Sequence, residues 1–142
     1  MKIIIWIALG VALIGLDQWS KLAIDKTFRG QENTYIPVIE NVFHLVYVEN
    51  RGVTFGMLKD IPTWLRKPVL VMLPIGIVVL LIFFFISGKG REKLTSFCLS
   101  LIIAGAIGNI IDRIRLDYVI DFLYFNVYVM WWPAFNVADS VI

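Results

Sequence analysis

The stretch Leu94 to Arg113, LTSFCLSLIIAGAIGNIIDR, decides the fold, because it joins a segment that lipid can surround to a polar end. Its first 18 residues, Leu94 to Ile111, carry no charge. They approach the roughly 20 apolar residues that a membrane-spanning helix needs. Ala104 and Gly108 form a small-xxx-small pair, which lets another helix approach closely. The stretch therefore predicts a membrane helix that carries the polar group Gly108 to Arg113 to one membrane surface.

The composition agrees with a membrane protein. The chain has 142 residues, the length of one domain. Its hydrophobic content of 59%, aromatic content of 14% and mean hydropathy of +0.81 exceed those of ordinary soluble domains. A soluble protein of this size could not bury so much apolar surface. We therefore expect one membrane-embedded domain over residues 1–142. The net charge of +2, with no basic run interleaved with aromatics, gives no support for nucleic-acid binding.

Two further apolar segments predict spans. The first covers about residues 3–24 and lacks a small-x-small cleavage site, which favours an uncleaved helix over a signal peptide. The second, Pro68 to Ile86, has 19 uncharged residues, and Pro74 within it predicts a kink. The third span is expected over about residues 94–111. The short basic turn Ser87 to Lys93 is typical of the cytoplasmic side, so residues 25–67 should lie outside.

The external segment carries strand signals. Tyr35 to Ile39 and Val42 to Val48 are rich in β-branched and aromatic residues, which predicts a small β-rich unit packed on the helices or the lipid surface. Tyr118 to Tyr128 has a similar alternation later in the chain. The run Trp131 to Pro133 is typical of an aromatic belt at the headgroups, which we favour over stacking on a substrate.

Residues 136–140, with the sequence NVADS, have the composition of a helix start, so a fourth span is expected to begin at residue 137. Only Val141 and Ile142 follow Ser140. We therefore expect this chain to be a truncated form of a longer protein, with low activity until an apolar segment of about 20 residues is added after Ile142.

The acids at the membrane boundary are the candidate functional groups. Ionisable groups there are costly to desolvate, so a functional site is the first hypothesis. Two carboxylates brought together can share one proton, as an aspartic hydrolase requires. Asp17 and Lys21, four residues apart, could form either part of such a site or an interfacial ion pair with a snorkelling lysine. Arg113 can pair with Asp112, which would make that acid structural.

Cys98 and His44 are each the only residue of their type. One cysteine excludes a disulfide within the chain, and there is no Cys/His cluster for zinc. We interpret Cys98 as a small hydrophobe packed between helices and His44 as an exposed strand residue. A Ser-His-Asp triad has little support, because no serine motif accompanies the histidine.

Five motifs in order resemble the lipoprotein signal peptidases, the signal peptidase II family of bacteria. The motifs are Asp17-Gln18-x-x-Lys21, Asn50-x-Gly52-x-x-Phe55-Gly56, Gly108-Asn109-x-x-Asp112-Arg113, Val119-Ile120-Asp121-Phe122 and Phe135-Asn136-x-Ala138-Asp139-Ser140. Each alone is weak, but five in the family's order over nearly the whole chain are specific. The resemblance implies an α-helical polytopic membrane protein, a four-helix transmembrane architecture with a small external β-rich cradle and, in this chain, a truncated fourth helix.

The resemblance also implies a function. The family removes signal peptides from diacylglyceryl-modified prolipoproteins by cutting before the lipidated cysteine, at the external face of the bacterial inner membrane. Its two catalytic aspartates correspond to Asp121 and Asp139, with Asp112 as the alternative partner of Asp139. The residues implied to line or brace the site are Asp17, Lys21, Asn50, Gly52, Asn109, Asp112, Arg113 and Asn136. No metal or other cofactor, no nucleic acid and no obligate protein partner are implied, only prolipoproteins and membrane lipids.

Two other functions remain as alternatives. A proton- or cation-conducting membrane protein could use the clustered acids as a path, although none lies in the middle of a predicted span. A non-catalytic membrane scaffold would need none of the polar motifs. Cleavage of a lipid-modified precursor by the purified protein distinguishes the peptidase from both.

Overall fold

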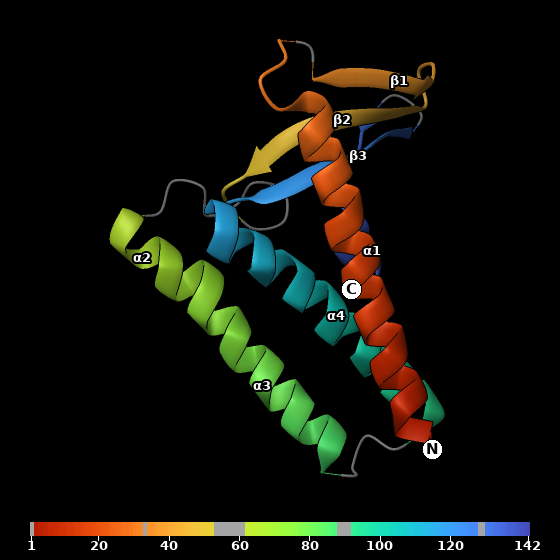
Figure 1. Ribbon diagram of the computed structural model, residues 1–142, viewed down its shortest axis with the longest axis vertical. Coiled ribbons are helices and arrows are strands. Elements are labelled where there is room, and N and C mark those ends of the chain that lie inside the picture. Colours follow the sequence, from red (N-terminus) through yellow and green to blue (C-terminus); the bar gives the residue numbers. More distant parts are fainter. Residues whose placement is uncertain (1, 33, 53–61, 88–91, 128–129) are drawn as a thin grey trace.

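The computed structural model describes residues 2–32, 34–52, 62–87, 92–127 and 130–142. The elements in chain order are α1 (Lys2–Phe28), β1 (Tyr35–Ile39), β2 (Phe43–Asn50), α2 (Thr63–Lys67), the π-helical turn η2 (Pro68–Met72), α3 (Leu73–Ile86), α4 (Lys93–Leu116), β3 (Val119–Val127), β4 (Met130–Trp131) and α5 (Val137–Ser140). In Figure 1, the long helices extend from one end of the molecule toward the sheet at the other end. The architecture is that of a helical membrane protein with a small antiparallel sheet.

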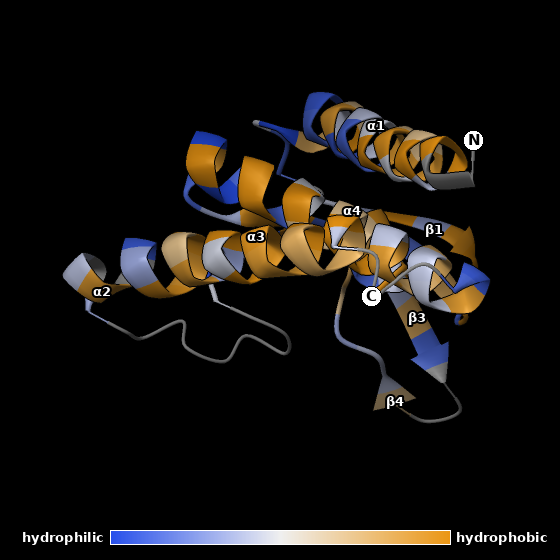
Figure 2. Cartoon of the chain, turned by 90° about the horizontal axis from the view of Figure 1, so that it is seen from below, coloured by the Kyte–Doolittle hydropathy of each residue, from blue (hydrophilic) through white to orange (hydrophobic). Residues whose placement is uncertain are grey.

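Among the described residues, three helical stretches are long and apolar enough to cross a membrane, namely Ile4–Phe28, Pro68–Ile86 and Lys93–Leu116. Figure 2 shows hydrophobic residues along the length of α1 and α3. The first and third stretches continue past residues 24 and 111, where the sequence pattern placed their ends. Charged residues within these helices do not interrupt them, because Asp17, Lys21 and Asp112 pair with one another inside the protein.

The helical backbone is irregular close to Pro74, where the sequence predicts a kink. Proline has no N–H to donate to the preceding turn, and the backbone immediately before α3 is π-helical over Pro68–Met72. Such wide turns are a common way of accommodating an interruption in the ladder of helical hydrogen bonds.

The sheet combines two distant parts of the chain in the order β1-β2-β3-β4. β2 from the segment between α1 and α2 pairs antiparallel with β3, which follows α4, and Val48 lies opposite Asp121. The expectation that the β-rich unit would be confined to residues 25–67 was therefore incomplete. Ile24 and Phe28 of α1 pack against Ile120 and Phe122 of β3, so the sheet is fixed to the end of the first helix.

Two sequence interpretations are wrong. His44 is 2% exposed rather than on the surface, because the rings of Tyr35 and Trp131 cover it with centroid separations of 4.5 Å each. β4 brings Trp131 onto this side of the sheet, and no local pattern in the sequence shows that return. Cys98 is exposed on α4 and is not packed between helices.

Candidate active site

Asp121 lies on β3 and is 2% exposed. Both of its carboxylate oxygens accept a hydrogen bond from an amide side chain. Asn50 at the end of β2 donates from Nδ2 to Oδ2 at 2.9 Å, and Asn136 donates from Nδ2 to Oδ1 at 2.7 Å. Asn50 is in turn oriented by the backbone N–H of Gly52, which donates to its Oδ1 at 3.0 Å. The carboxylate is therefore held on both sides.

Asp139 is held by the geometry of a helix start. Asn136 is the N-cap of α5, and its Oδ1 accepts from the backbone N–H of Asp139 at 2.9 Å. In return, Asp139 Oδ2 accepts from the backbone N–H of Asn136 at 3.3 Å, which completes a capping box. Asn109 of α4 donates from Nδ2 to the other oxygen, Oδ1, at 2.7 Å. Residues 136–140 therefore begin a helix as expected, and the exposed Asp139 has a defined orientation.

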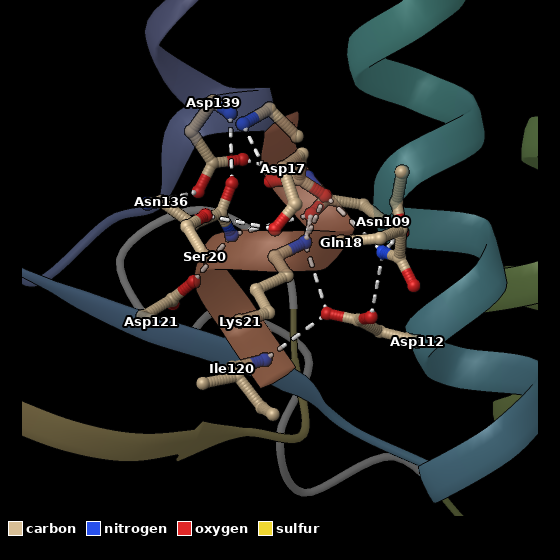
Figure 3. A network of polar contacts seen from close by, with 12 residues as sticks. Asp17, Gln18, Ser20, Lys21, Asn109, Asp112, Ile120, Asp121, Asn136 and Asp139 are labelled. Atoms are coloured by element: carbon tan, nitrogen blue, oxygen red, sulfur yellow. Dashed lines mark hydrogen bonds and ion pairs between the residues drawn. The ribbon is translucent and has the colours of Figure 1, made fainter. Parts of the chain in front are cut away.

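Asn136 joins the two aspartates. It is fully buried, and the same side chain donates to Asp121 and accepts from the backbone of Asp139 (Figure 3). Burial raises the pKa of Asp121 to about 6. The hydrogen bond from Asn50 lowers this pKa, the nearby charge of Asp139 raises it, and the hydrogen bond from Asn136 lowers it. The site thus contains one buried acid with a raised pKa beside one exposed acid.

Lys21 connects α1 to α4 through a buried ion cluster. Its Nζ lies 2.9 Å from Asp17 Oδ2 and 2.9 Å from Asp112 Oδ2, and it donates to Asn109 Oδ1 at 2.9 Å. Lys21 is 2% exposed, so the alternative of a snorkelling lysine is wrong. A lone charge could not remain buried here. The three acceptors satisfy the three N–H donors of the ammonium group.

Asp112 is a member of this cluster and does not pair with Arg113. Besides Lys21, it accepts from Gln18 Nε2 at 3.0 Å and from the backbone N–H of Ile120 at 3.4 Å. Arg113 instead donates from Nη2 to the carbonyl oxygen of Gly52 at 2.9 Å. The expected pair between Asp112 and Arg113 is therefore wrong, because Lys21 reaches Asp112 from the neighbouring helix.

The sequence reasoning did not include Gln18 or Gly108 among the site residues. Gln18 contacts Asp17, Asp112 and the carbonyl oxygen of Gly108. A Cβ at Gly108 would lie 2.6 Å from Asp17 Oδ2, so this glycine makes room for the ion cluster. Both residues are within the quoted motifs, and the adjacency of Gln18 to Asp17 was the available signal. Gly108 belongs to the small-xxx-small pair that was predicted to allow close helix approach, and it lies next to Asp17 of α1 and Ala138 of α5.

Two hollows meet at Asp121. One, of about 470 Å³, contains Asp121, Asp139, Asn109, Arg113 and Trp132 among its lining residues. The other, of about 770 Å³, extends along β2 past Asn50 and Gly52 and also reaches Asp121. In the part of the chain that the structure describes, no three His, Cys, Asp or Glu side chains are grouped to hold a metal ion. The arrangement offers a paired acid and base, with amide donors, at the junction of two openings.

The chain is similar to known proteins over most of its length. A model of the family described as signal peptidase (SPase) II matches residues 9–142. A protein named lipoprotein signal peptidase from Halothermothrix orenii is 39% identical over 128 residues, which are 90% of this chain and 80% of the relative. One with the same name from Burkholderia ambifaria is 42% identical over 138 residues, 96% of this chain and 80% of the relative.

Solved structures agree with this match. A structure titled "Bacterial membrane enzyme structure by the in meso method at 2.3 A resolution" superposes with a TM-score of 0.84 at 29% identity, covering 96% of this chain and 79% of that one. A second, with the same title at 1.9 Å resolution, gives a TM-score of 0.78 at 28% identity and covers 96% and 83%.

Proposed function

The chain belongs to the signal peptidase II family, and from this premise we propose that it is an aspartic endopeptidase that uses Asp121 and Asp139. Membership makes it a membrane protease of the lipoprotein signal peptidase type and argues against the proton-conducting alternative. The observation that carries the aspartic mechanism is that Asn136 joins both residues. Its side chain donates to the carboxylate of Asp121 and accepts from the backbone N–H of Asp139. We treat residues 1–142 as one peptidase domain.

Asp121 is proposed to begin protonated and Asp139 ionised. Asp121 is buried and its pKa is raised to about 6, whereas Asp139 is exposed and can reach water. Ionised Asp139 takes a proton from water as the water oxygen attacks the scissile carbonyl carbon. Asp121 donates its proton to the carbonyl oxygen, which gives a tetrahedral diol. Asp139 then protonates the amide nitrogen, Asp121 recovers a proton from a hydroxyl group, and the C–N bond breaks.

The amides and Arg113 are proposed to position the reacting groups. Asn109 and Asn50 hold one aspartate each. Arg113 binds the carbonyl oxygen of Gly52 and lines the hollow beside both acids, so it fixes the end of the β2 segment next to the scissile bond. Preorganised donors of this kind stabilise developing charge without reorganisation during the reaction. Asp17, Lys21 and Asp112 brace α1 and α4 behind them.

The substrate class follows from the relatives' name and from the two openings. We propose that prolipoproteins bearing a diacylglyceryl group on the cysteine after the cut are the substrates. The 470 Å³ hollow is lined by Ile110, Trp132 and Pro74, on the side of the membrane helices. The 770 Å³ hollow follows the sheet. The active site is proposed to lie at the external face of the bacterial inner membrane, because it is at the opposite end of α4 from the basic turn Ser87 to Lys93, which is typical of the cytoplasmic side. An aromatic belt at Trp131 to Pro133 stays a prediction.

The pH profile tests the assignment of the protonated acid. If Asp121 must carry the proton, kcat/KM should fall as pH rises above about 6, because the protonated fraction declines about tenfold per pH unit. Replacing Asn50 by alanine removes a hydrogen bond that lowers this pKa. The alkaline limb of the Asn50→Ala enzyme should therefore lie at higher pH than that of the unmodified enzyme.

The measurement is the initial rate of cleavage of a lipidated precursor between about pH 5 and 9 at constant ionic strength. It gives the alkaline limb of the unmodified enzyme and of Asn50→Ala. A limb that moves to lower pH in Asn50→Ala, or a flat profile across this range, contradicts the role given to Asp121. Asn50→Ala also loses a contact with substrate-facing groups, so the position of the limb, and not the absolute rate, is the relevant result.

Substrate choice tests the function itself. Purified protein should cut a diacylglyceryl-modified precursor and cut the unlipidated precursor at least tenfold more slowly. The acyl chains contribute about 0.8 kcal/mol per buried methylene to membrane partitioning, which concentrates the substrate at the site. The measurement is a gel shift with identification of the new N-terminus. Equal rates on both precursors, or a cut elsewhere than before the cysteine, would overturn the proposal.

A further inference from the structure

A groove separate from the aspartate site lies between the sheet-side ends of α1 and α4. It consists of two adjoining hollows of about 120 Å³ and 560 Å³, which share Leu22, Asp25 and Arg29 as lining residues. The smaller hollow continues inward to Lys21 and Asp112. It therefore lies against the ion cluster on the side of Asp25 and Arg115.

The rim of the groove is positively charged. Lys26 and Arg29 at the end of α1 and Arg115 at the end of α4 are all exposed. The one carboxylate at the rim, Asp25, already accepts from Arg29 Nε at 3.0 Å and from the hydroxyl of Tyr47 at 2.8 Å. At the floor, Lys21 lies between Asp17 and Asp112 and adds no net positive charge. An anion is thus favoured at the rim and not at the floor.

Apolar and basic residues follow an order along α1, from Trp19 outside the groove to Arg29, one residue past the end of the helix. Trp19, Leu22, Lys26 and Arg29 have spacings of three, four and three, which places them on one helical face. Trp19 is 68% exposed and Leu22 is 50% exposed. The face is therefore apolar within the span and basic where the span ends at Phe28. This order matches a lipid, with acyl chains below and a charged headgroup above.

We propose that this groove binds the phosphodiester of an anionic membrane phospholipid. Lys26 and Arg29 contact the phosphate from α1, Arg115 contacts it from α4, and one acyl chain lies along Leu22 and Trp19. Guanidinium groups match phosphate oxygens with two parallel donors. A phosphate between the two helices adds a link beside the buried one that Lys21 makes from α1 to Asp112.

The groove shares residues with the support of the active site. Gln18 and Lys21 line its inner part, and Lys21 also binds Asn109, which donates to Asp139. Arg115 itself donates to Gln18 Oε1 at 3.4 Å. A phosphate held by Arg115 is therefore connected to Asp139, without entering the proposed reaction, through the contacts of five side chains, Arg115, Gln18, Asp112, Lys21 and Asn109.

Native mass spectrometry of the purified full chain tests the proposal. The protein is mixed in detergent with equal amounts of phosphatidylglycerol and phosphatidylcholine, and the lipid retained at increasing collision energy is measured. The expected result is at least threefold preferential retention of phosphatidylglycerol. Lys26→Gln and Arg115→Gln together should remove the preference. Lys67→Gln is the control, because Lys67 is exposed and pairs with Asp117, two residues after Arg115, but does not line the groove.

Three results would overturn the proposal. The first is equal retention of both lipids by the unmodified protein, a comparison that depends on no variant. The second is equal loss of the preference in Lys67→Gln, which would indicate attraction to the surface in general. The third is full displacement of phosphatidylglycerol by a large excess of inorganic phosphate, which would assign the groove to a free anion.

Discussion

Replacing either Asp121 or Asp139 by asparagine is expected to lower the rate of precursor cleavage by roughly a thousandfold or more, within the range associated with loss of a general acid or base. An amide cannot take a proton from water and cannot donate one as a carboxylic acid does. The size of each side chain is retained, so membrane insertion should be unchanged. The measurement is the gel shift of a lipidated precursor under single-turnover conditions, with the amount of folded protein fixed by size-exclusion chromatography.

Asp117→Asn is the matched control for this experiment. Asp117 is an exposed acid directly after α4, and the described ion pair that it makes is a loose one with Lys67 at 3.7 Å. Its replacement should leave the rate within about twofold, as for most exposed ion pairs. Near-normal cleavage by Asp121→Asn would remove this residue from the mechanism. The partner of Asp139 would then have to be Asp112, despite its contacts with Lys21 and Gln18.

Replacing Lys21 by methionine should destabilise the protein by about 3–5 kcal/mol, the range measured when one partner of a buried ion pair is removed. Methionine has a similar length but no charge, so Asp17 and Asp112 would remain buried without their shared cation. Asn109 would also lose a donor next to Asp139. Unfolding in detergent, followed by tryptophan fluorescence as a function of denaturant, gives the difference in free energy.

Two further variants separate the charge from the packing. Lys67→Met removes an exposed lysine and should change the stability by less than about 1 kcal/mol. Adding Asp112→Asn to Lys21→Met removes one of the two stranded carboxylates and should restore part of the loss. If Lys21→Met proves as stable as Lys67→Met, the charge of Lys21 makes no net contribution to stability, and α1 is held on α4 by apolar contacts and by the hydrogen bonds of Gln18.

The helices and the chemistry of their ends could be predicted because they depend on local properties. An uncharged run of 18 residues is visible without any partner, and Asn136 and Asp139 have the spacing of a capping box within four residues. The motif comparison identified the acids by position. None of this required knowledge of which segments are neighbours.

The contacts that define the site could not be predicted, because they join residues far apart in the chain. Lys21 and Asp112 are in direct contact although β1, β2, α2, η2 and α3 lie between them in the chain, and a lysine near the end of a span is equally compatible with snorkelling. His44 is covered by Trp131, and α2, η2, α3, α4 and β3 lie between these two residues in the sequence. Alternation along a strand says which residues share a face, but not which later segment covers that face.

The pairing of β2 with β3 has a consequence for the order in which the protein is assembled. These strands lie on either side of α3 and α4 in the chain, so they can pair only after both helices have crossed the membrane. Asp121 and Asp139 are synthesised after all four residues of the ion cluster, Asp17, Lys21, Asn109 and Asp112. A nascent chain that has inserted α1 and α3 therefore still lacks both aspartates, and under the proposed mechanism it cannot cleave a precursor before β3 and α5 have been synthesised.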